Sequence, residues 1–487
     1  MSAVTSGLRS ARVRRGVAAA AVILATGGLV LAREPRGGGA GGKPPLVTAP
    51  IAIPSGVNAV TFAGPGAHGQ IALSHTKVLA RAGEPVFAEV RVVADASDGA
   101  HARAPLSLAV VLDTSGSMDG DKIERAKASV LELIGDMRDD DEIAFVRYSS
   151  GAELIQPLAR LGRVRGQLAA RVRGLDAGGG TNIPSGLAMG LHEIESGSGQ
   201  DDFGRVRRVV LVSDGLDSTR EQAERLATDG AERGVTVSSM GIGLDFDEAY
   251  MSSIARDGHG NFGFVNDAGA LATFLHRELD EASSTTVENA TVRIDLPKGV
   301  RFVRASGADA RVEGGGESVR VRLGSLFAGD ERRALLELAT DLDAGDARAL
   351  GTEATWHRVG AGDADVRAPA LALTATTDAT EVSKGEDGAV LGSATSVLSS
   401  RRELEATEAY ASGNVEKARQ LIQENLQALA QAAARAPAPV AQRLAKQSSA
   451  YSSHAAAFAA PPSSDDGKRA AKAAAAKDSS NLAREAF

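Results

Sequence analysis

Apolar and polar positions follow two different periodicities along the chain. From residue 106 onward, segments that are apolar at every position, such as 108–112 and 209–212, alternate with stretches whose apolar residues lie three and four apart. Continuously apolar strands are typical of parallel strands covered on both faces, and the stretches between them have the pattern of amphipathic helices. The sequence therefore predicts a doubly wound (Rossmann-like) α/β domain over residues 104–284.

The segments on either side of this domain show a period of two. Val292, Ile294 and Leu296 alternate with polar residues, and similar alternation recurs to about residue 375, which predicts an antiparallel β-sandwich module over residues 285–380. Residues 70–103 carry a shorter pair of alternating strands, which would be marginal alone. We expect these early strands to join the later module, so that the α/β domain is an insertion in one β sandwich.

The C-terminal part is predicted to be helical over residues 388–460. Ile422 and Leu429 belong to one apolar stripe at three- and four-residue steps, and a Gly-Asn pair at positions 413–414 marks a break between two helices. Residues 461–487 are rich in Ala, Lys, Ser and Asp and offer no sizeable apolar face. We therefore expect a disordered tail there.

The beginning of the chain has the layout of an export segment. Four arginines between positions 9 and 15 precede a run of apolar or small residues from Gly16 to Ala32. This pattern predicts a signal peptide or an uncleaved membrane anchor over residues 1–33, followed by a Gly/Pro-rich linker over residues 34–69. Both alternatives place the working part of the chain outside the cytoplasm, either secreted or periplasmic or anchored to the membrane by this segment.

The composition excludes several kinds of function. The 487 residues include no cysteine, so thiolate metal sites and thiol nucleophiles are excluded. The formal net charge is −8, and aromatic residues make up only 3%. Because the chain has neither a global positive field nor many stacking rings, we expect it not to bind nucleic acid. The eight histidines include no His-x-x-x-His pair, so a zinc hydrolase has no support.

Oxygen-bearing side chains stand at the ends of the predicted strands. Asp113, Ser115 and Ser117 follow one apolar strand, Thr181 lies in a Gly-rich loop before a helix, and Asp214 follows another apolar strand. Taken singly, such residues are usual in helix caps and turns. Taken together at the carboxyl ends of parallel strands, where open sheets bind ligands, they offer an all-oxygen shell. Such a shell suits Mg²⁺, and in some settings Mn²⁺ or Ca²⁺.

The order of these residues resembles the von Willebrand factor type A domain with its metal-ion-dependent adhesion site. The likeness extends to the predicted helix that begins Asp121-Lys-Ile-Glu, the strand that begins Asp141-Glu-Ile-Ala and the loop Gly180-Thr181-Asn182, and it covers about residues 104–284. The arrangement of this domain with later β strands and helices is similar to bacterial envelope proteins of the family and, more distantly, to inter-alpha-trypsin inhibitor heavy chains.

The resemblance implies a role for each of the five residues. Ser115, Ser117 and Thr181 are expected to meet a divalent cation directly or through water, whereas Asp113 and Asp214 would act mainly through water and by accepting hydrogen bonds from hydroxyls. The cation would remain under-neutralised and would take an Asp or Glu side chain from a protein partner. The chain is accordingly expected to be a metal-dependent adhesion or scaffold protein of the cell envelope and not an enzyme.

Two other functions remain as alternatives. The first is an Asp-dependent phosphotransferase or hydrolase that uses the same metal site. Chemistry resembling that of the haloacid dehalogenase group requires a second Asp two residues after the nucleophile, whereas position 115 is Ser. The second is a recruiting partner of an AAA-type ATPase, as some relatives are. The export segment disfavours that alternative.

Overall fold

The computed structural model describes most of the chain after residue 56. The segment 1–33, expected to be a signal peptide or anchor, lies outside the described residues. No helix within the described ranges is long and apolar enough to cross a membrane. These ranges are 57–96, 104–197, 205–214, 217, 219–243, 246–265 and 268–482.

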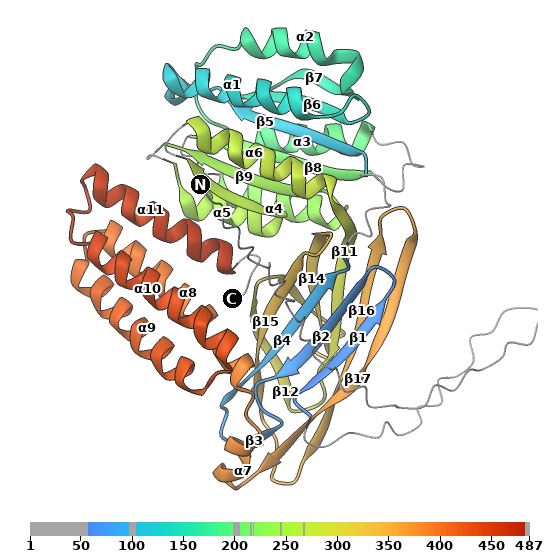
Figure 1. The fold of residues 1–487 in the computed structure, drawn as a ribbon, viewed down its shortest axis with the longest axis vertical. Coiled ribbons are helices and arrows are strands. Elements are labelled where there is room, and N and C mark those ends of the chain that lie inside the picture. Colours follow the sequence, from blue (N-terminus) through green and yellow to red (C-terminus); the bar gives the residue numbers. More distant parts are fainter. Residues whose placement is uncertain are drawn as a thin grey trace, which may run out of the picture. The chain divides into compact units, whose positions relative to one another are not determined.

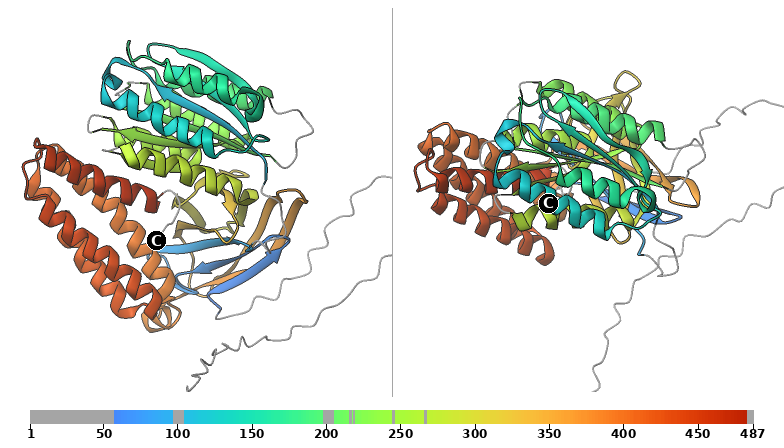
Figure 2. Two further views of the ribbon diagram at one scale, coloured as in Figure 1. Left: turned by 45° about the horizontal axis from the view of Figure 1, so that its top comes forward. Right: turned by 90° about the horizontal axis from the view of Figure 1, so that it is seen from above.

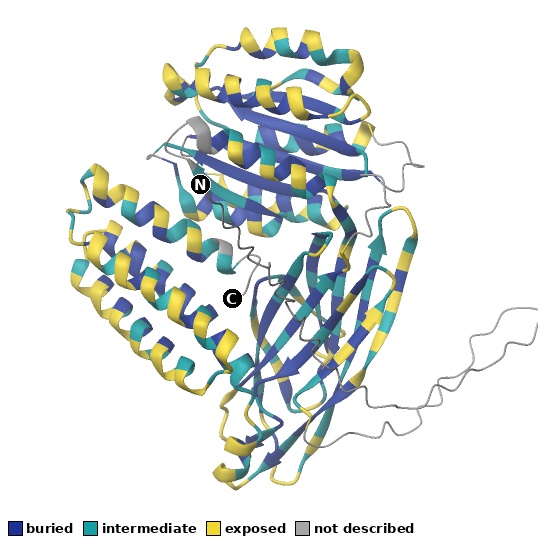
Figure 3. Cartoon of the chain, viewed as in Figure 1, coloured by how far each residue is buried: buried dark blue, intermediate teal, exposed yellow. Residues whose placement is uncertain are grey.

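A six-stranded sheet forms the centre of the α/β domain. Its strand order is β10-β9-β8-β5-β6-β7, and all neighbours are parallel except the edge pair β6 and β7. The central strand β5 is buried along its whole length (Figure 3), because helices cover both faces of the sheet. The strands are β5 Leu106–Asp113, β6 Glu142–Tyr148, β7 Ala152–Arg160, β8 Val206–Ser213, β9 Thr236–Ile242 and β10 His259–Val265.

Three helices pack on each face of this sheet (Figures 1 and 2), which confirms the doubly wound fold. The packing is close: a Cβ added at Gly190 would lie 2.5 Å from the Cγ2 atom of Val111. The loops that follow β5, β8 and β9 therefore meet at one edge of a rigid sheet. One face carries α1 Asp121–Asp136, α2 Leu161–Arg173 and α6 Ala268–Ser283, and the other carries α3 Ile183–Gly197, α4 Arg220–Glu232 and α5 Glu248–Asp257.

The strands that precede and follow the α/β domain in the sequence form two largely antiparallel sheets, which share one apolar core. Their orders are β1-β2-β4-β15-β12 and β13-β14-β11-β16-β17-β3. The early strand β4 pairs with the late strand β15 along nine residue pairs, so the early strands belong to the later β module, and the α/β domain is inserted between β4 and β11. The strands are β1 Ala59–Gly64, β2 Ala67–Leu73, β3 Lys77–Leu79, β4 Pro85–Ala94, β11 Thr285–Asp295, β12 Val300–Ser306, β13 Asp309–Glu313, β14 Ser318–Phe327, β15 Glu331–Thr340, β16 Ala347–Arg358 and β17 Gly362–Thr376.

The linker expected over residues 34–69 is wrong at its C-terminal end. β1 and the start of β2 lie there and form a hairpin, with Gly66 at a φ of +81° in the turn. Gly69 belongs to β2, and the ring of Phe62 lies across it. A side chain at this position would clash, because an added Cβ would lie 2.3 Å from the ring. Gly66 and Gly69 are therefore turn and close-packing residues, and not part of a linker. Residues 34–56 of the expected linker lie outside the described residues.

The pair of strands expected within residues 70–103 is also only partly correct. β2 and β4 pair as expected, but the short β3 between them leaves this sheet and pairs in parallel with β17 of the second sheet. The turn after β3, with Arg81 at a φ of 56°, therefore connects the two sheets of the sandwich and does not close a simple hairpin.

The C-terminal part is helical, as predicted, and its helices from residue 388 onward lie side by side in both views of Figure 2. The disordered tail expected over 461–487 is wrong for α11, in which Ala471 and Ala474 are buried against the bundle. Alanine has the highest helix propensity, and its small side chain lets helices approach closely, so a large apolar face is not needed. The helices are α7 Ala379–Lys384, α8 Gly388–Ala411, α9 Val415–Arg435, α10 Ala438–Ala457 and α11 Asp465–Ser480.

Candidate metal centre

Asp113 ends β5 at the carboxyl edge of the sheet and is completely buried. The backbone N–H of Ser115 donates to its Oδ1 atom (2.8 Å), and the Ser213 hydroxyl donates to its Oδ2 atom (2.7 Å). Both oxygens are therefore held by short local hydrogen bonds, one from its own loop and one from the end of β8. This arrangement fixes the carboxylate relative to the serine loop.

A chain of hydroxyls joins Asp113's loop to the second carboxylate. The Oγ atoms of Ser115 and Ser117 lie 3.0 Å apart, and Ser117 donates to Oδ1 of Asp214 at 2.7 Å. Asp214 comes directly after β8, which is the neighbour of β5 in the sheet. Four of the five residues predicted from the sequence thus form one hydrogen-bonded cluster.

The loop that carries Thr181 is held against the serine loop by its backbone. The N–H of Gly116 donates to the carbonyl of Gly179 (3.0 Å), and the N–H of Gly178 donates to the carbonyl of Thr114 (2.7 Å). Gly179 has a φ of +89°, which glycine adopts without strain. The structure therefore brings the Thr181 loop to the cluster, while the contacts themselves are made by the backbone and not by the half-buried Thr181 side chain.

The electrostatics of the cluster favour a cation. Burial raises the pKa of Asp113 above its ordinary value, and the negative charge of Asp214 raises it further. The hydrogen bonds from Ser115 and Ser213 oppose this effect by stabilising the charged form. Two carboxylates held this close in a buried setting are stabilised by any positive charge placed between their loops.

Two residues of the cluster were missed in the sequence analysis. The ammonium of Lys122, the second residue of α1, pairs with Oδ2 of Asp214. Ser213 is the last residue of the apolar strand β8. Only their positions in the sequence could have indicated a place in the cluster: Lys122 lies at the start of the helix that follows the serine loop, and Ser213 immediately precedes Asp214.

The donors fit a hard divalent ion. Hydroxyl and carboxylate oxygens are the ligands that Mg²⁺ prefers, with water completing the shell. Within the described residues, no group of three or more His, Cys, Asp and Glu side chains could hold a metal. A metal held by the described residues would therefore depend on serine and threonine hydroxyls as much as on carboxylates. Ser115, Ser117 and Thr181 supply such hydroxyls.

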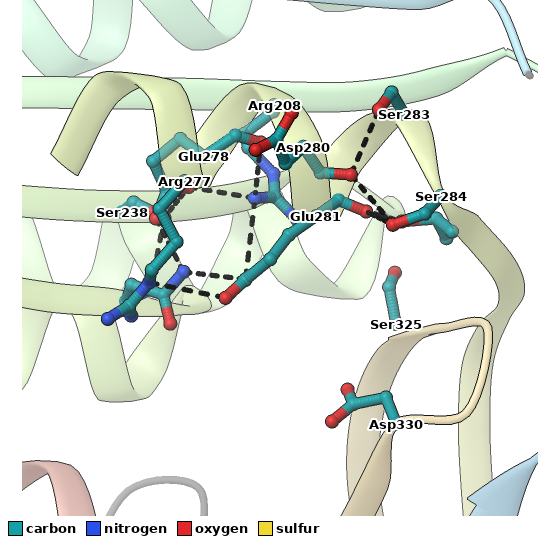
Figure 4. Close-up of polar contacts among 12 residues, drawn as sticks. Arg208, Ser238, Arg277, Glu278, Asp280, Glu281, Ser283, Ser284, Ser325 and Asp330 are labelled. Atoms are coloured by element: carbon teal, nitrogen blue, oxygen red, sulfur yellow. Dashed lines mark hydrogen bonds and ion pairs between the residues drawn. The ribbon is translucent and has the colours of Figure 1, made fainter. Parts of the chain in front are cut away.

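A second polar network lies toward the amino ends of the same strands (Figure 4). Arg208 of β8 donates to Oε2 of Glu278 on α6 (2.8 Å), and Ser238 of β9 donates to the same atom (2.7 Å). The side chains of Arg208 and Glu278 are both buried. Because the carboxylate is neutralised by its own ion pair and hydrogen bonds, this network anchors α6 to the sheet and leaves the carboxyl edge as the candidate site.

Comparison with known proteins identifies the α/β domain. The family model of the von Willebrand factor type A domain matches residues 107–277. The chain is 31% identical over 261 residues to the uncharacterized protein sll0103 of Synechocystis sp., an alignment that covers 51% of this chain and 60% of that protein. It is 25% identical over 186 residues to human inter-alpha-trypsin inhibitor heavy chain H4, covering 37% of this chain and 19% of that protein. The chain thus spans less than two thirds of these relatives.

Solved structures with the same fold extend beyond this domain. A von Willebrand factor type A protein from Catenulispora acidiphila matches with a TM-score of 0.66 at 18% identity and covers 89% of this chain and 99% of that one. The ArnB paralog VWA2 from Sulfolobus acidocaldarius matches with a TM-score of 0.58 at 15% identity, over 86% of this chain and 99% of that one. The fold of the flanking modules is therefore shared with these proteins, and the α/β domain is the part of the chain that matches the von Willebrand factor type A domain.

Proposed function

We propose that this chain binds a protein partner through a divalent cation, with Mg²⁺ as the first candidate, held by Asp113, Ser115, Ser117, Thr181 and Asp214. Domains of this family commonly mediate protein–protein interaction. The observation that carries the metal-dependent part is the continuous hydrogen-bonded cluster from Asp113 through the two serines to Asp214. It gathers hard oxygen donors from two strand ends into one place.

The chemistry of this donor set favours an acidic partner. The hydroxyls of Ser115, Ser117 and Thr181 carry no charge, so a bound cation would be neutralised only by the two carboxylates and their surroundings. Ser117 is exposed to solvent while Asp113 and Asp214 are buried, which leaves the cation approachable from one side. An Asp or Glu side chain of the partner would complete the coordination there.

Calorimetric titration of the full chain with Mg²⁺ and Mn²⁺ tests the metal site. We expect saturable binding by the wild-type chain and a loss of about 100-fold in affinity for Asp113→Ala, because a buried carboxylate that holds the serine loop is removed. Asp119→Ala is the matched control, since Asp119 is an exposed carboxylate two residues beyond Ser117. Equal cation affinity in all three proteins would contradict the proposal.

Affinity capture tests the partner. The full chain, immobilised, is exposed to an envelope extract with Mg²⁺ or with a chelator, in parallel with Asp113→Ala and Asp119→Ala. A partner of the proposed kind is retained by the wild-type chain and by Asp119→Ala only when Mg²⁺ is present. A retained protein that survives both the chelator and Asp113→Ala would bind elsewhere and would count against the metal-bridged mechanism.

We propose a binding function in preference to the enzymatic alternative. Asp113 is hydrogen-bonded at both oxygens, and the residue two positions later is Ser115, which cannot serve as a carboxylic general acid. Incubation with a phosphoryl donor such as acetyl phosphate, followed by mass spectrometry, distinguishes the two functions. A phosphoryl adduct on Asp113 would reverse the assignment.

We also propose that the chain works outside the cytoplasm, in the cell envelope. The support is the sequence of residues 1–33, in which arginines precede a long apolar run. Cell fractionation combined with N-terminal sequencing of the mature protein tests this. A cytoplasmic protein with an intact leader would contradict it, whereas a cleaved N-terminus near residue 33 would select the signal peptide over the anchor.

A further inference from the structure

Lys122 places a positive charge inside the candidate metal centre. Its ammonium pairs with Oδ2 of Asp214, whose other oxygen accepts the Ser117 hydroxyl. The Asp214 side chain is fully buried, whereas Lys122 is 32% exposed. The ammonium is therefore held at a buried carboxylate by a side chain that is itself partly exposed to solvent.

The backbone after β9 confines the lysine. A Cβ added at Gly243 would lie 3.3 Å from Cε and 3.4 Å from Nζ of Lys122, so the side chain is flanked by this loop as well as by Asp214. Gly243 has a φ of +82°, a conformation that suits glycine. The ammonium is thus held in a defined place and is not a freely moving surface charge.

The charges of the cluster have a simple balance. The carboxylates of Asp113 and Asp214 and the ammonium of Lys122 leave one net negative charge, because the remaining donors are neutral hydroxyls. A divalent cation would turn this into one net positive charge, and a single carboxylate from outside would neutralise it. Without the lysine, the two carboxylates alone would neutralise the divalent ion, and an external anion would gain less.

We propose that Lys122 determines the specificity of this site: its charge weakens the hold of the domain on the cation and makes the loaded site select an acidic ligand over a neutral one. The inference rests on the proposed function. A purely structural lysine, which only covers the buried Asp214, makes the opposite prediction, because its removal would loosen Asp214 and weaken cation binding.

The test compares Lys122→Met and Lys122→Arg in the full chain, with Arg125→Met as the matched control. Arg125 is on the same helix and pairs with Asp121 at an exposed position. Calorimetry with Mn²⁺ is expected to show roughly tenfold or more tighter binding by Lys122→Met, and near wild-type affinity for Lys122→Arg and Arg125→Met. Urea unfolding of each variant establishes that it is folded.

The second measurement uses acetate as the acidic probe and acetamide as the neutral one. Since coupling between two ligands is reciprocal, acetate is expected to tighten Mn²⁺ binding more in the wild-type chain than in Lys122→Met. Acetamide is expected to leave the Mn²⁺ affinity of both proteins unchanged. Folded Lys122→Met with unchanged or weaker Mn²⁺ affinity would overturn the inference. If the wild-type chain itself binds no Mn²⁺, the proposed function fails first, so the two failures are distinguishable.

Discussion

Two clusters of carboxylates and hydroxyls, one in the α/β domain and one in the helical segment, differ in what completes them. In the α/β domain, Asp113 and Asp214 lie in strand-end loops beside an exposed serine. In the helical segment, Glu403 and Asp478 lie in the interior, each buried to at least 97%. The first cluster presents oxygen donors toward solvent, whereas the second is enclosed by helices. The comparison indicates that access to solvent, and not residue type, distinguishes the candidate ligand site from the enclosed network.

The donors of the helical cluster come from the chain itself. Glu403 is 2.9 Å from Nδ1 of His454, and it accepts from the Asn425 amide at 3.1 Å. Tyr451 donates to Oδ1 of Asp478 at 2.7 Å. Because these contacts join α8, α9, α10 and α11, the polar interior specifies how the four helices pack.

The largest effect is expected for removal of a buried acid from the helical cluster. Glu403→Ala leaves Asn425 and His454 without their buried partner and should lower the free energy of unfolding by about 3–5 kcal/mol. Glu405→Ala, at an exposed position paired with Lys417, should change it by less than about 1 kcal/mol. Urea denaturation measures both. Similar losses of stability in the two variants would mean that leaving Asn425 and His454 without their buried partner costs little free energy.

The pH dependence of stability should also report on the helical cluster. Burial has the largest effect on the pKa of Asp478 and, together with the charge of Glu403, raises it to about 7. Hydrogen bonds with Tyr451 and Ser400 and the charge of His454 act in the opposite direction and are smaller. Since the folded state holds the proton more tightly than the unfolded state, this group stabilises the fold at low pH. Its contribution is lost as the pH rises from about 4 to about 7, by up to about 4 kcal/mol.

Urea denaturation across this pH range checks the prediction, with Asp478→Asn as the comparison. The neutral amide cannot ionise, so the variant should lose this part of the pH dependence while keeping the rest. A wild-type slope equal to that of the variant would show that Asp478 ionises normally in the folded chain.

The stability of the candidate metal centre should depend on the concentration of the cation. If Mg²⁺ binds the folded chain only, a concentration 100 times its Kd raises the free energy of unfolding by about 2.7 kcal/mol. We expect this stabilisation to vanish in Asp113→Asn and to persist in Asp478→Asn. Thermal denaturation with Mg²⁺ and with a chelator measures it. Stabilisation that persisted in Asp113→Asn would place the cation elsewhere.

A smaller effect is expected where the helical segment meets the α/β domain. Lys472 of α11 pairs with Glu248 at 2.6 Å, donates to the carbonyl of Phe246 at 2.9 Å and lies 4.2 Å from the centre of the Phe246 ring. Lys472→Ala should lower the free energy of unfolding by about 1–2 kcal/mol. Lys477→Ala, exposed on the same helix, should be close to neutral. Equal effects would show that this contact adds little.

The sequence predicted features that depend on local pattern. The continuously apolar strands identified the parallel sheet, and the positions of Asp113 and Asp214 directly after such strands followed from that assignment. Features that depend on contacts between distant segments were missed. The expected linker included β1 and the start of β2, where Gly66 serves the turn between the two strands and Gly69 lies against the ring of Phe62. The segment of α11 was expected to be disordered because alanines bury little area each. The pairing of Lys122 with Asp214 joins residues 92 positions apart, and no local pattern encodes it.

The insertion of the α/β domain has a mechanical consequence. The domain is joined to the sandwich through β4, an internal strand of one sheet, and through β11, an internal strand of the other. Each of these strands is hydrogen-bonded to a neighbour on both sides. Force applied to a ligand on this domain would be divided between two sheets and would load four strand pairings together. Extraction of either tether from the sandwich would require the hydrogen bonds of two strand pairings to break.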